Sequence, residues 1–511
     1  MGRAVAHGSF WMVVNTGITR AASLGATIIL GRLLDDHAWG IYALAMSAAA
    51  IAGTFRDGGV RHLLMQRQKE YETLIGPVFW LALAFNLACG GALALAAPLI
   101  ARAVAEPEAT PLMLVIAASL PLSTPGVIMQ ARLSIDLRFR EVGYIMGASG
   151  VVRFGGAIIL ALLGVGPLAF VLPLLACALL EWALSWRITR ERLWTRPAHA
   201  SRWPAMIGAS AWIMLGALGV SVINWGGNLS VKPFVETEIV GAYFFAFQIV
   251  VQVGILLSSN LNAVLFPALA KIANEPARLA QASARALRQV MLLAAPMSVG
   301  LGVTFPAIEA LLFAGKKSES VTAVLIQGAT YAFAVLLAVP LSVQQARGRF
   351  RSWAIGLTLT GLAGLVAAAG GAAMHGTPAG IAAWAGGFTA LSGVAYALVT
   401  LRRIGVPISD TLASALPGWA AAVACGALAW WVDSRLAGLG VGVVPSLVPE
   451  GLRRYVFECV RLVIVGSVFG ASFTLVARVL LAGHVREALA LVPARLRGHA
   501  ERLLRLRSAP T

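Results

Sequence analysis

Apolar segments of about 20 residues recur along the whole chain of 511 residues, and short breaks with charged residues, proline or glycine separate them. A helix needs about 20 apolar residues to cross the hydrocarbon core of a bilayer. Hydrophobic residues make up 59% of the sequence and charged residues 12%, which a water-soluble domain of this size does not tolerate. The sequence therefore predicts an all-α polytopic membrane protein without a large extramembrane domain.

The apolar segments predict about fourteen transmembrane helices. The first is too long for the apolar region of a cleavable signal peptide, so we expect the mature protein to retain it. The predicted spans are 9–31, 38–60, 75–101, 109–131, 142–163, 166–188, 205–229, 238–267, 288–313, 321–345, 353–373, 379–401, 411–432 and 457–481.

Basic residues gather in every second loop, beginning with the loop after the second span, whereas the alternate loops hold few. The positive-inside rule then predicts that both termini are cytoplasmic. The formal charge of +18 follows from this bias and implies no nucleic-acid partner. The tail 483–511 places leucines among arginines and is predicted to be a basic amphipathic helix on anionic lipids of the inner leaflet. The four cysteines are isolated, so we expect neither a metal site nor a cofactor.

An internal repeat emerges when the sequence is shifted against itself. A shift of 201 residues aligns Leu33–Ala45 with Phe234–Ala246, and Gly40 with Gly241. A shift of 211 residues aligns Arg138-Phe139-Arg140 with Arg349-Phe350-Arg351. Six spans per repeat leave both halves in one orientation, which predicts two six-helix lobes related by an axis along the membrane normal. The expected domains are lobes at 1–200 and 201–405, two extra helices at 406–482, and the tail at 483–511.

Arg20 lies within the first predicted span, where an arginine costs about 3 kcal/mol on insertion scales and normally faces a wet cavity or an anionic partner. Thr16 and Ser23 share its helical face. The repeat places neutral residues opposite the charged residues of the first half, so the fold itself does not require these charges. The aligned pairs are Arg20 with Ser221, Arg56 with Leu257, Asp57 with Ser258, and Arg153 with Gly364.

The second half contributes neutral polar residues, since Asn224 and Asn228 share one face of the seventh span. Arginine suits a phosphate because its planar group forms two parallel charge-assisted hydrogen bonds and stays protonated when partly desolvated. We therefore expect a cavity for an amphiphile with a phosphate head and an apolar tail. Alternatives remain open: Arg20 paired with Asp57, Arg56 as an interfacial anchor, and the asparagines as interhelical contacts. The predicted substrate-binding residues are Thr16, Arg20, Ser23, Arg56, Asp57, Arg153, Asn224 and Asn228.

The N-terminal region resembles the polysaccharide flippases of the multidrug/oligosaccharidyl-lipid/polysaccharide exporter superfamily. The resemblance lies in Gly31-Arg32-Leu33-Leu34, the acidic pair Asp35-Asp36, Gly40, Phe55-Arg56-Asp57-Gly58, Gln66-Arg67 and the basic loop with Arg138-Phe139-Arg140. It implies a transporter, not an enzyme, that flips an undecaprenyl-diphosphate-linked oligosaccharide across a bacterial inner membrane for surface or exopolysaccharide biosynthesis by alternating access. Arg20 and Arg56 occupy places comparable to arginines thought to hold the diphosphate in the related lipid II flippases.

The resemblance also implies glycosyltransferases and a polysaccharide polymerase as candidate protein partners. Three other functions remain as alternatives. A lipid II flippase would share the fold, and a cation-coupled multidrug antiporter would need buried carboxylates that the first span lacks. A membrane-embedded glycosyltransferase or polymerase would need catalytic acidic or histidine residues in an outer loop, and the longest outer break, about 433–450, has no such arrangement.

Overall fold

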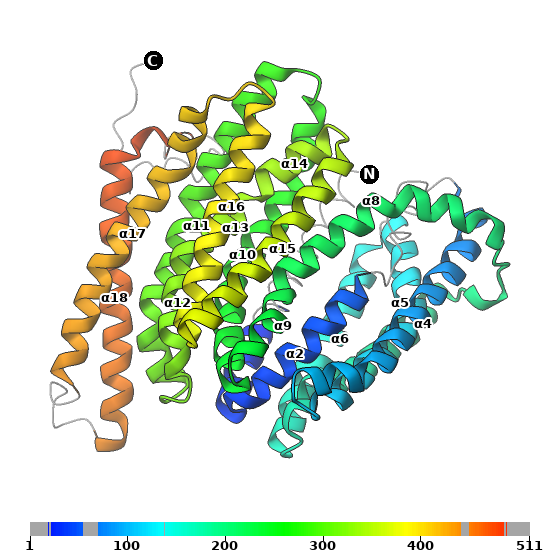
Figure 1. Cartoon of the computed structure of the whole chain (residues 1–511), viewed down its shortest axis with the longest axis horizontal. Coiled ribbons are helices and arrows are strands. Elements are labelled where there is room, and N and C mark those ends of the chain that lie inside the picture. The colour runs from blue at the N-terminus through cyan, green and yellow to red at the C-terminus, as the bar shows by residue number, and fades with distance from the viewer. Residues whose placement is uncertain are drawn as a thin grey trace. The chain divides into compact units, whose positions relative to one another are not determined.

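The computed structural model describes residues 19, 22–54, 70–136, 138–440, 449–484 and 487, and every regular element within them is helical (Figure 1). A short apolar helix, Ala22–Leu33, comes first. The labelled helices are α2 (Asp36–Gly53), α4 (Tyr71–Ala103), α5 (Ala109–Ile135), α6 (Phe139–Leu162), α7 (Leu172–Thr189), α8 (Trp203–Ser221), α9 (Gly227–Val231), α10 (Thr237–Lys271), α11 (Pro276–Leu312), α12 (Ser318–Thr330), α13 (Ala332–Leu336), α14 (Ala338–Ala346), α15 (Phe350–His375), α16 (Pro378–Arg402), α17 (Ile408–Leu439) and α18 (Glu450–Leu480).

Eleven segments of the described chain are long and apolar enough to span a membrane. They correspond to eleven of the predicted spans, which confirms the all-α polytopic class. The remaining three predictions are not among them. The predicted spans 9–31 and 38–60 extend beyond the described residues, and 205–229 is divided into α8, a π-helical turn at Val222–Gly226, and α9.

Two helices depart from their predicted bounds for identifiable reasons. Helix α11 begins at Pro276, well before the predicted residue 288, because Leu279, Leu287 and Val290 recur at helical spacing and are buried in this amphipathic extension. The predicted span 321–345 is divided into α12, α13 and α14. Pro340 lacks the amide that would bond to the carbonyl four residues earlier, which accounts for the break before α14.

The chain divides into two compact units. The first comprises Met1–Phe244 with Leu357–Ala369, and the second comprises Phe245–Gly356 with Gly370–Thr511. The middle of α15 joins the first unit because it packs closely on α8: a Cβ at Gly219 would meet the backbone of Leu357 and Thr358. The lobe boundaries predicted at residues 200 and 405 follow the sequence repeat and stay a prediction.

Local structure repeats where the sequence does. Helix α2 starts at Asp36 and α10 at Thr237, 201 residues later. Helices α6 and α15 both start at the phenylalanine of Arg-Phe-Arg, and the preceding arginines have nearly the same backbone angles, φ −86° and ψ 54° at Arg138 and φ −84° and ψ 52° at Arg349. The amide of Arg138 donates to the Leu133 carbonyl, and that of Arg349 donates to Gln344, the equivalent position.

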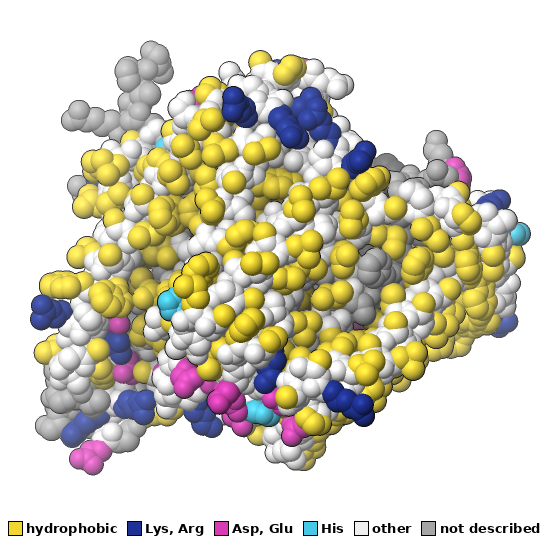
Figure 2. All heavy atoms as spheres, viewed as in Figure 1, with side chains coloured by type: hydrophobic (Ala, Val, Ile, Leu, Met, Phe, Trp, Pro, Cys, Tyr) yellow, Lys and Arg dark blue, Asp and Glu magenta, His cyan; other side chains and the backbone are white. Residues whose placement is uncertain are grey.

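In the second unit, α17 and α18 form a hairpin whose two helices run side by side (Figure 1). The apolar side chains of α18 are largely exposed, including Val463 and Leu475, as expected for a helix facing lipid. On the visible surface of α15 and α16, hydrophobic side chains cover the middle and charged ones lie toward the ends (Figure 2).

A buried group of ion pairs connects the two helices of this hairpin. Arg461 of α18 donates to both carboxylate oxygens of Asp433 on α17, at 2.7 and 2.8 Å, and to Glu458 at 3.2 Å. All three side chains are at least 89% buried, with exposed fractions of 11%, 6% and 10%. These residues are the Arg461 triad.

Candidate functional site

The predicted site residues divide into two groups. Thr16, Arg20, Arg56 and Asp57 lie outside the described residues. Ser23, Arg153, Asn224 and Asn228 are described and belong to the first unit. Ser23 is partly buried, and its carbonyl accepts a hydrogen bond from Thr27 at 2.9 Å. Thr19 contacts α6 at Gly150, where an added Cβ would lie 3.6 Å from the threonine methyl group.

Arg153 lies near the middle of α6, about 21 Å along the helix from Phe139. Its guanidinium lies near the hydroxyl of Tyr42 on α2 and interacts with it electrostatically. Arg153 is exposed, as are Tyr144 and Val151, but it lies on the opposite side of α6 from these two residues, the side that carries it toward Tyr42 of α2. None of the ion pairs within the described chain includes Arg153.

Glu181 lies beside this arginine and was not among the predicted site residues. It accepts a hydrogen bond from Ser149 of α6 at 2.6 Å and one from Gln130 of α5 at 3.5 Å. It is on α7, about 12 Å from the end of the helix at Thr189. The Cys177 thiol is within electrostatic range of both Arg153 and Glu181. The first unit thus has an exposed positive group, Arg153, and a partly buried carboxylate, Glu181, with neutral hydrogen-bond partners.

The two asparagines have different surroundings. Asn228 is 4% exposed and donates to the hydroxyl of Ser47 on α2 at 3.1 Å, so it connects α9 to α2 as an interhelical contact. Asn224 lies in the π-helical turn and donates to the Val220 carbonyl at 2.9 Å. One turn earlier, Ser221 accepts a hydrogen bond at 2.6 Å from Thr54, the residue that follows α2. The neutral polar face of this segment therefore points toward α2.

The first turns of α2 and α10 meet in a reciprocal contact that we call the glycine contact. A Cβ on Gly40 would overlap the carbonyl oxygen of Thr237, and a Cβ on Gly241 would overlap that of Asp36. These four residues form two pairs related by the shift of 201, so each repeat makes the same contact with the other. Backbones approach this closely only where glycine removes the side chain.

Aromatic rings and ion pairs surround the glycine contact. Tyr42 stacks on Phe170 at 4.2 Å between ring centroids, and Phe244 lies 5.8 Å from Tyr42. Lys232 pairs with Glu106 at 3.2 Å, and both side chains are almost buried, at 12% and 13% exposed. Thr237 also donates to Glu106, and His37 lies 3.7 Å from it. Apolar and polar contacts thus pack the first turns of α2 and α10 tightly together at this end of the first unit.

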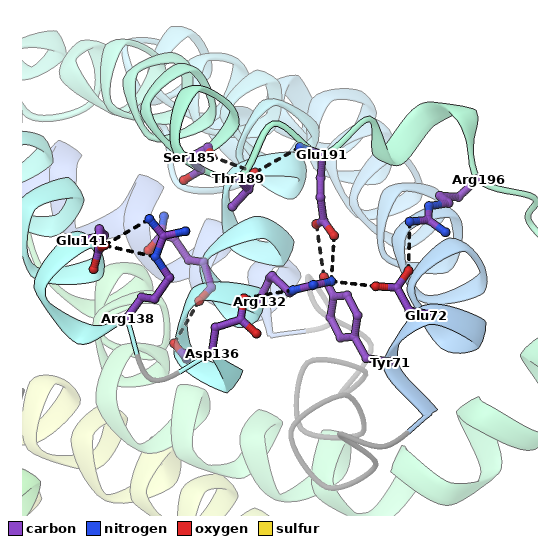
Figure 3. Close-up of polar contacts among 12 residues, drawn as sticks. Tyr71, Glu72, Arg132, Asp136, Arg138, Glu141, Ser185, Thr189, Glu191 and Arg196 are labelled. Atoms are coloured by element: carbon purple, nitrogen blue, oxygen red, sulfur yellow. Dashed lines mark hydrogen bonds and ion pairs between the residues drawn. The ribbon is translucent and has the colours of Figure 1, made fainter. Parts of the chain in front are cut away.

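A second group of ion pairs, the Arg132 cluster, lies at the N-terminal end of α4 (Figure 3). Arg132 of α5 donates to Glu72 at 2.9 Å, to Glu191 at 3.0 Å and to Asp136 at 3.1 Å. Its guanidinium lies 4.6 Å from the ring centroid of Tyr71, whose hydroxyl donates to Glu191. Burial raises the pKa of the Glu191 carboxyl, and the charge of Arg132 opposes this effect. The cluster joins α4, α5 and the loop after α7.

We expect Arg132→Ala to lower the free energy of unfolding by about 1–3 kcal/mol, because three carboxylates lose charge-assisted hydrogen bonds and Glu191 is mostly buried. The thermal unfolding midpoint of the purified protein measures this loss. Arg138→Ala is the control, since within the described chain Arg138 pairs with the partly exposed Glu141 three residues later and contributes little. Equal shifts in the two variants would contradict the role of the cluster.

Taken together, the first unit has an arginine in mid-membrane, a nearby carboxylate with neutral partners, and a closed end at the glycine contact. A guanidinium with no carboxylate partner can bind a phosphate in a low-dielectric environment. No group of three or more histidine, cysteine or acidic side chains suited to a metal ion occurs within the described ranges. The geometry therefore favours binding of an anionic ligand.

Comparison with known proteins identifies the family of the chain. Residues 29–322 match the model of a family described as "Polysaccharide biosynthesis protein". The chain is 24% identical to the lipopolysaccharide biosynthesis protein WzxC of Escherichia coli K12 over 62% of this chain and 65% of that protein. It is 23% identical to the succinoglycan biosynthesis transport protein ExoT of Rhizobium meliloti 1021 over 57% and 59%. The aligned region thus spans less than two thirds of both relatives.

Solved structures share the fold at low sequence identity. The lipid II flippase MurJ in an inward closed conformation matches with a TM-score of 0.66 and 14% identity, over 89% of this chain and 98% of that one. A multidrug MATE transporter in an inward-facing conformation matches with a TM-score of 0.55 and 16% identity, over 76% and 94%. These relatives are transporter-family proteins rather than enzymes. The chain therefore belongs to the polysaccharide biosynthesis protein family and has the all-helical fold shared by these flippases and multidrug transporters.

Proposed function

We propose that the protein is a flippase that moves an undecaprenyl-diphosphate-linked oligosaccharide across the bacterial inner membrane for surface or exopolysaccharide biosynthesis. The observation that carries this proposal is Arg153, an arginine in mid-membrane that faces α2 and belongs to no ion pair within the described chain. Family membership supports polysaccharide precursors as the substrate class. The equivalent position in the second repeat is Gly364, so the first repeat alone would bind the diphosphate.

The proposed mechanism is alternating access between two six-helix lobes. Two further transmembrane helices follow the second lobe, and both termini are in the cytoplasm. The duplicated helix starts and the reciprocal glycine contact support the lobes. In this orientation the Arg132 cluster is cytoplasmic and the glycine contact is periplasmic. The diphosphate would enter from the cytoplasm, bind Arg153 together with Arg20 and Arg56, and leave after the lobes separate at the glycine contact.

We expect Arg153→Ala to lower surface polysaccharide by about tenfold or more, because loss of a hydrogen bond to a charged group costs about 1.5–3 kcal/mol. Arg153→Lys keeps a point charge but not the planar fork, so it should retain part of the activity. Arg20→Ala should reduce export in the same way. The measurement is the amount of surface polysaccharide in a deletion strain that carries each variant, at matched levels of membrane protein.

Arg140→Ala is the matched control, because Arg140 is an exposed arginine in the first turn of the same helix. It should export at the wild-type level. Accumulation of the lipid-linked precursor in the Arg153→Ala strain would locate the defect at translocation. Wild-type export by Arg153→Ala and Arg20→Ala would refute the proposed site, and rescue of lethal depletion of the cell's own lipid II flippase would assign the alternative function.

A further inference from the structure

The second unit contains a cavity whose lining includes none of the residues proposed to bind the transported substrate. It has a volume of about 510 Å³, which is within the range of 300–1,000 Å³ that is typical of small-ligand sites. Its wall consists of the start of α11, the turn before α17, the first turns of α17, and residues that follow α18. Its charged or titratable side chains are Arg285, Arg288, Asp410, His484 and Glu487.

The position of these side chains along their helices places the cavity at the membrane surface. Arg288 precedes the end of α11 by about 36 Å of helix, whereas the hydrocarbon core is about 30 Å thick. Asp410 is in the first turn of α17, and His484 follows the end of α18 at Leu480. All three segments therefore bring their charged residues to the level of lipid headgroups at one surface.

Among the described residues, two arginines and two carboxylates line the cavity. Arg285 is exposed on α11, and Arg288 pairs loosely with Glu487 at 3.5 Å. The Nε of Arg288 and the Oε2 of Glu487 have no hydrogen-bond partner, so the loose pair leaves a donor and an acceptor unsatisfied. Asp410 is exposed on the opposite wall. Burial and the charge of Arg288 lower the pKa of His484, which keeps the imidazole neutral at neutral pH.

A net-neutral wall of this kind does not favour a purely anionic ligand. It offers arginine donors for a phosphate and carboxylate acceptors for an ammonium group. We propose that the cavity binds the zwitterionic headgroup of an inner-leaflet phospholipid with a phosphate and a primary amine, as in phosphatidylethanolamine. Arg285 and Arg288 bind the phosphate, and Asp410 and Glu487 accept hydrogen bonds from the ammonium group.

The proposal is tested by measuring lipid retention on the full-length protein with native mass spectrometry. The protein is exchanged into detergent with equal amounts of phosphatidylethanolamine, phosphatidylcholine and phosphatidylglycerol. We expect preferential retention of phosphatidylethanolamine, because phosphatidylcholine has no N–H donor and phosphatidylglycerol has no cation. In the double variant Arg285→Ala/Arg288→Ala the preference should fall by about tenfold, the loss expected for one charge-assisted hydrogen bond.

Arg278→Ala is the matched control, because Arg278 lies on the same helix outside the cavity and pairs with Glu275 on the surface. It should retain the wild-type preference. Asp410→Asn should reduce the discrimination against phosphatidylcholine without loss of folding, since Asp410 is exposed. Competition by soluble phosphoethanolamine supports recognition of the headgroup. Equal retention of all three lipids, or displacement by inorganic phosphate alone, would overturn the proposal.

Discussion

Replacement of Gly241 by alanine should abolish transport, because the new Cβ would overlap the carbonyl oxygen of Asp36. Backbone atoms cannot rotate aside as a flexible side chain does, so α2 and α10 must move apart at their first turns. The closed form of this end is then disfavoured. If release occurs here, the protein accumulates in the form open at this end and cannot bind substrate from the other side.

Two measurements test this expectation. Surface polysaccharide should fall by about tenfold or more at matched protein levels, because overpacking costs about 1–3 kcal/mol or more. Labelling of a cysteine introduced at the buried Ala38 by an impermeant reagent should increase. Gly40→Ala should have the same effect, since Gly40 makes the reciprocal contact. Gly91→Ala is the control, because no atom lies within 4 Å of its added Cβ. Wild-type export and wild-type labelling in both Gly241→Ala and Gly40→Ala would exclude a role of the glycine contact in transport.

Arg461→Met should have the largest effect on stability. It leaves Asp433 and Glu458 buried without a positive partner, and loss of one member of a buried ion pair typically costs about 3–5 kcal/mol. The expected result is a large decrease in the thermal unfolding midpoint, with the hairpin of α17 and α18 opening first. Limited proteolysis of the segment between these helices reports that opening.

A control variant and a rescue variant distinguish the loss of charge pairing from the loss of side-chain packing. Arg435→Ala removes an exposed arginine of α17 whose guanidinium lies 5.4 Å from the ring centroid of Trp431, so it should change stability little. The triple variant Asp433→Asn/Glu458→Gln/Arg461→Gln has no buried charge and should recover most of the lost stability. A triple variant as unstable as Arg461→Met would show that pairing is not the cause.

The sequence was most informative where composition or duplication determines the structure. Long apolar segments predicted eleven spans between α4 and α18, since a bilayer admits little else, whereas the predicted span 205–229 is divided. The two Arg-Phe-Arg segments aligned by the sequence repeat have backbone angles that agree within a few degrees, although the predicted spans at 142 and 353 begin three residues after the observed helix starts. The repeated glycines also marked the contact between α2 and α10, although the sequence alone did not indicate that they touch each other.

The site was harder to predict because its partners come from different helices. Arg153 was identified as an intramembrane charge, but its partner Tyr42 lies on a helix more than a hundred residues earlier. Asn228 donates to Ser47, the interhelical contact that the sequence left open beside a role in the cavity, since an isolated polar residue fits either environment equally well. Glu181 has only neutral hydrogen-bond partners, Ser149 and Gln130, which no charge pattern in the sequence reveals.

The π-helical turn at Val222–Gly226 has a consequence for the segment that follows it. Such a turn contains one residue more than the same length of α-helix. It therefore determines in which direction around the helix axis the following side chains point. Removal of a single residue would restore the regular winding and rotate the downstream side chains by about 100°. Asn228 would then face away from Ser47. The π-helical turn thus determines the direction of the Asn228 side chain and allows its amide to reach Ser47 on α2.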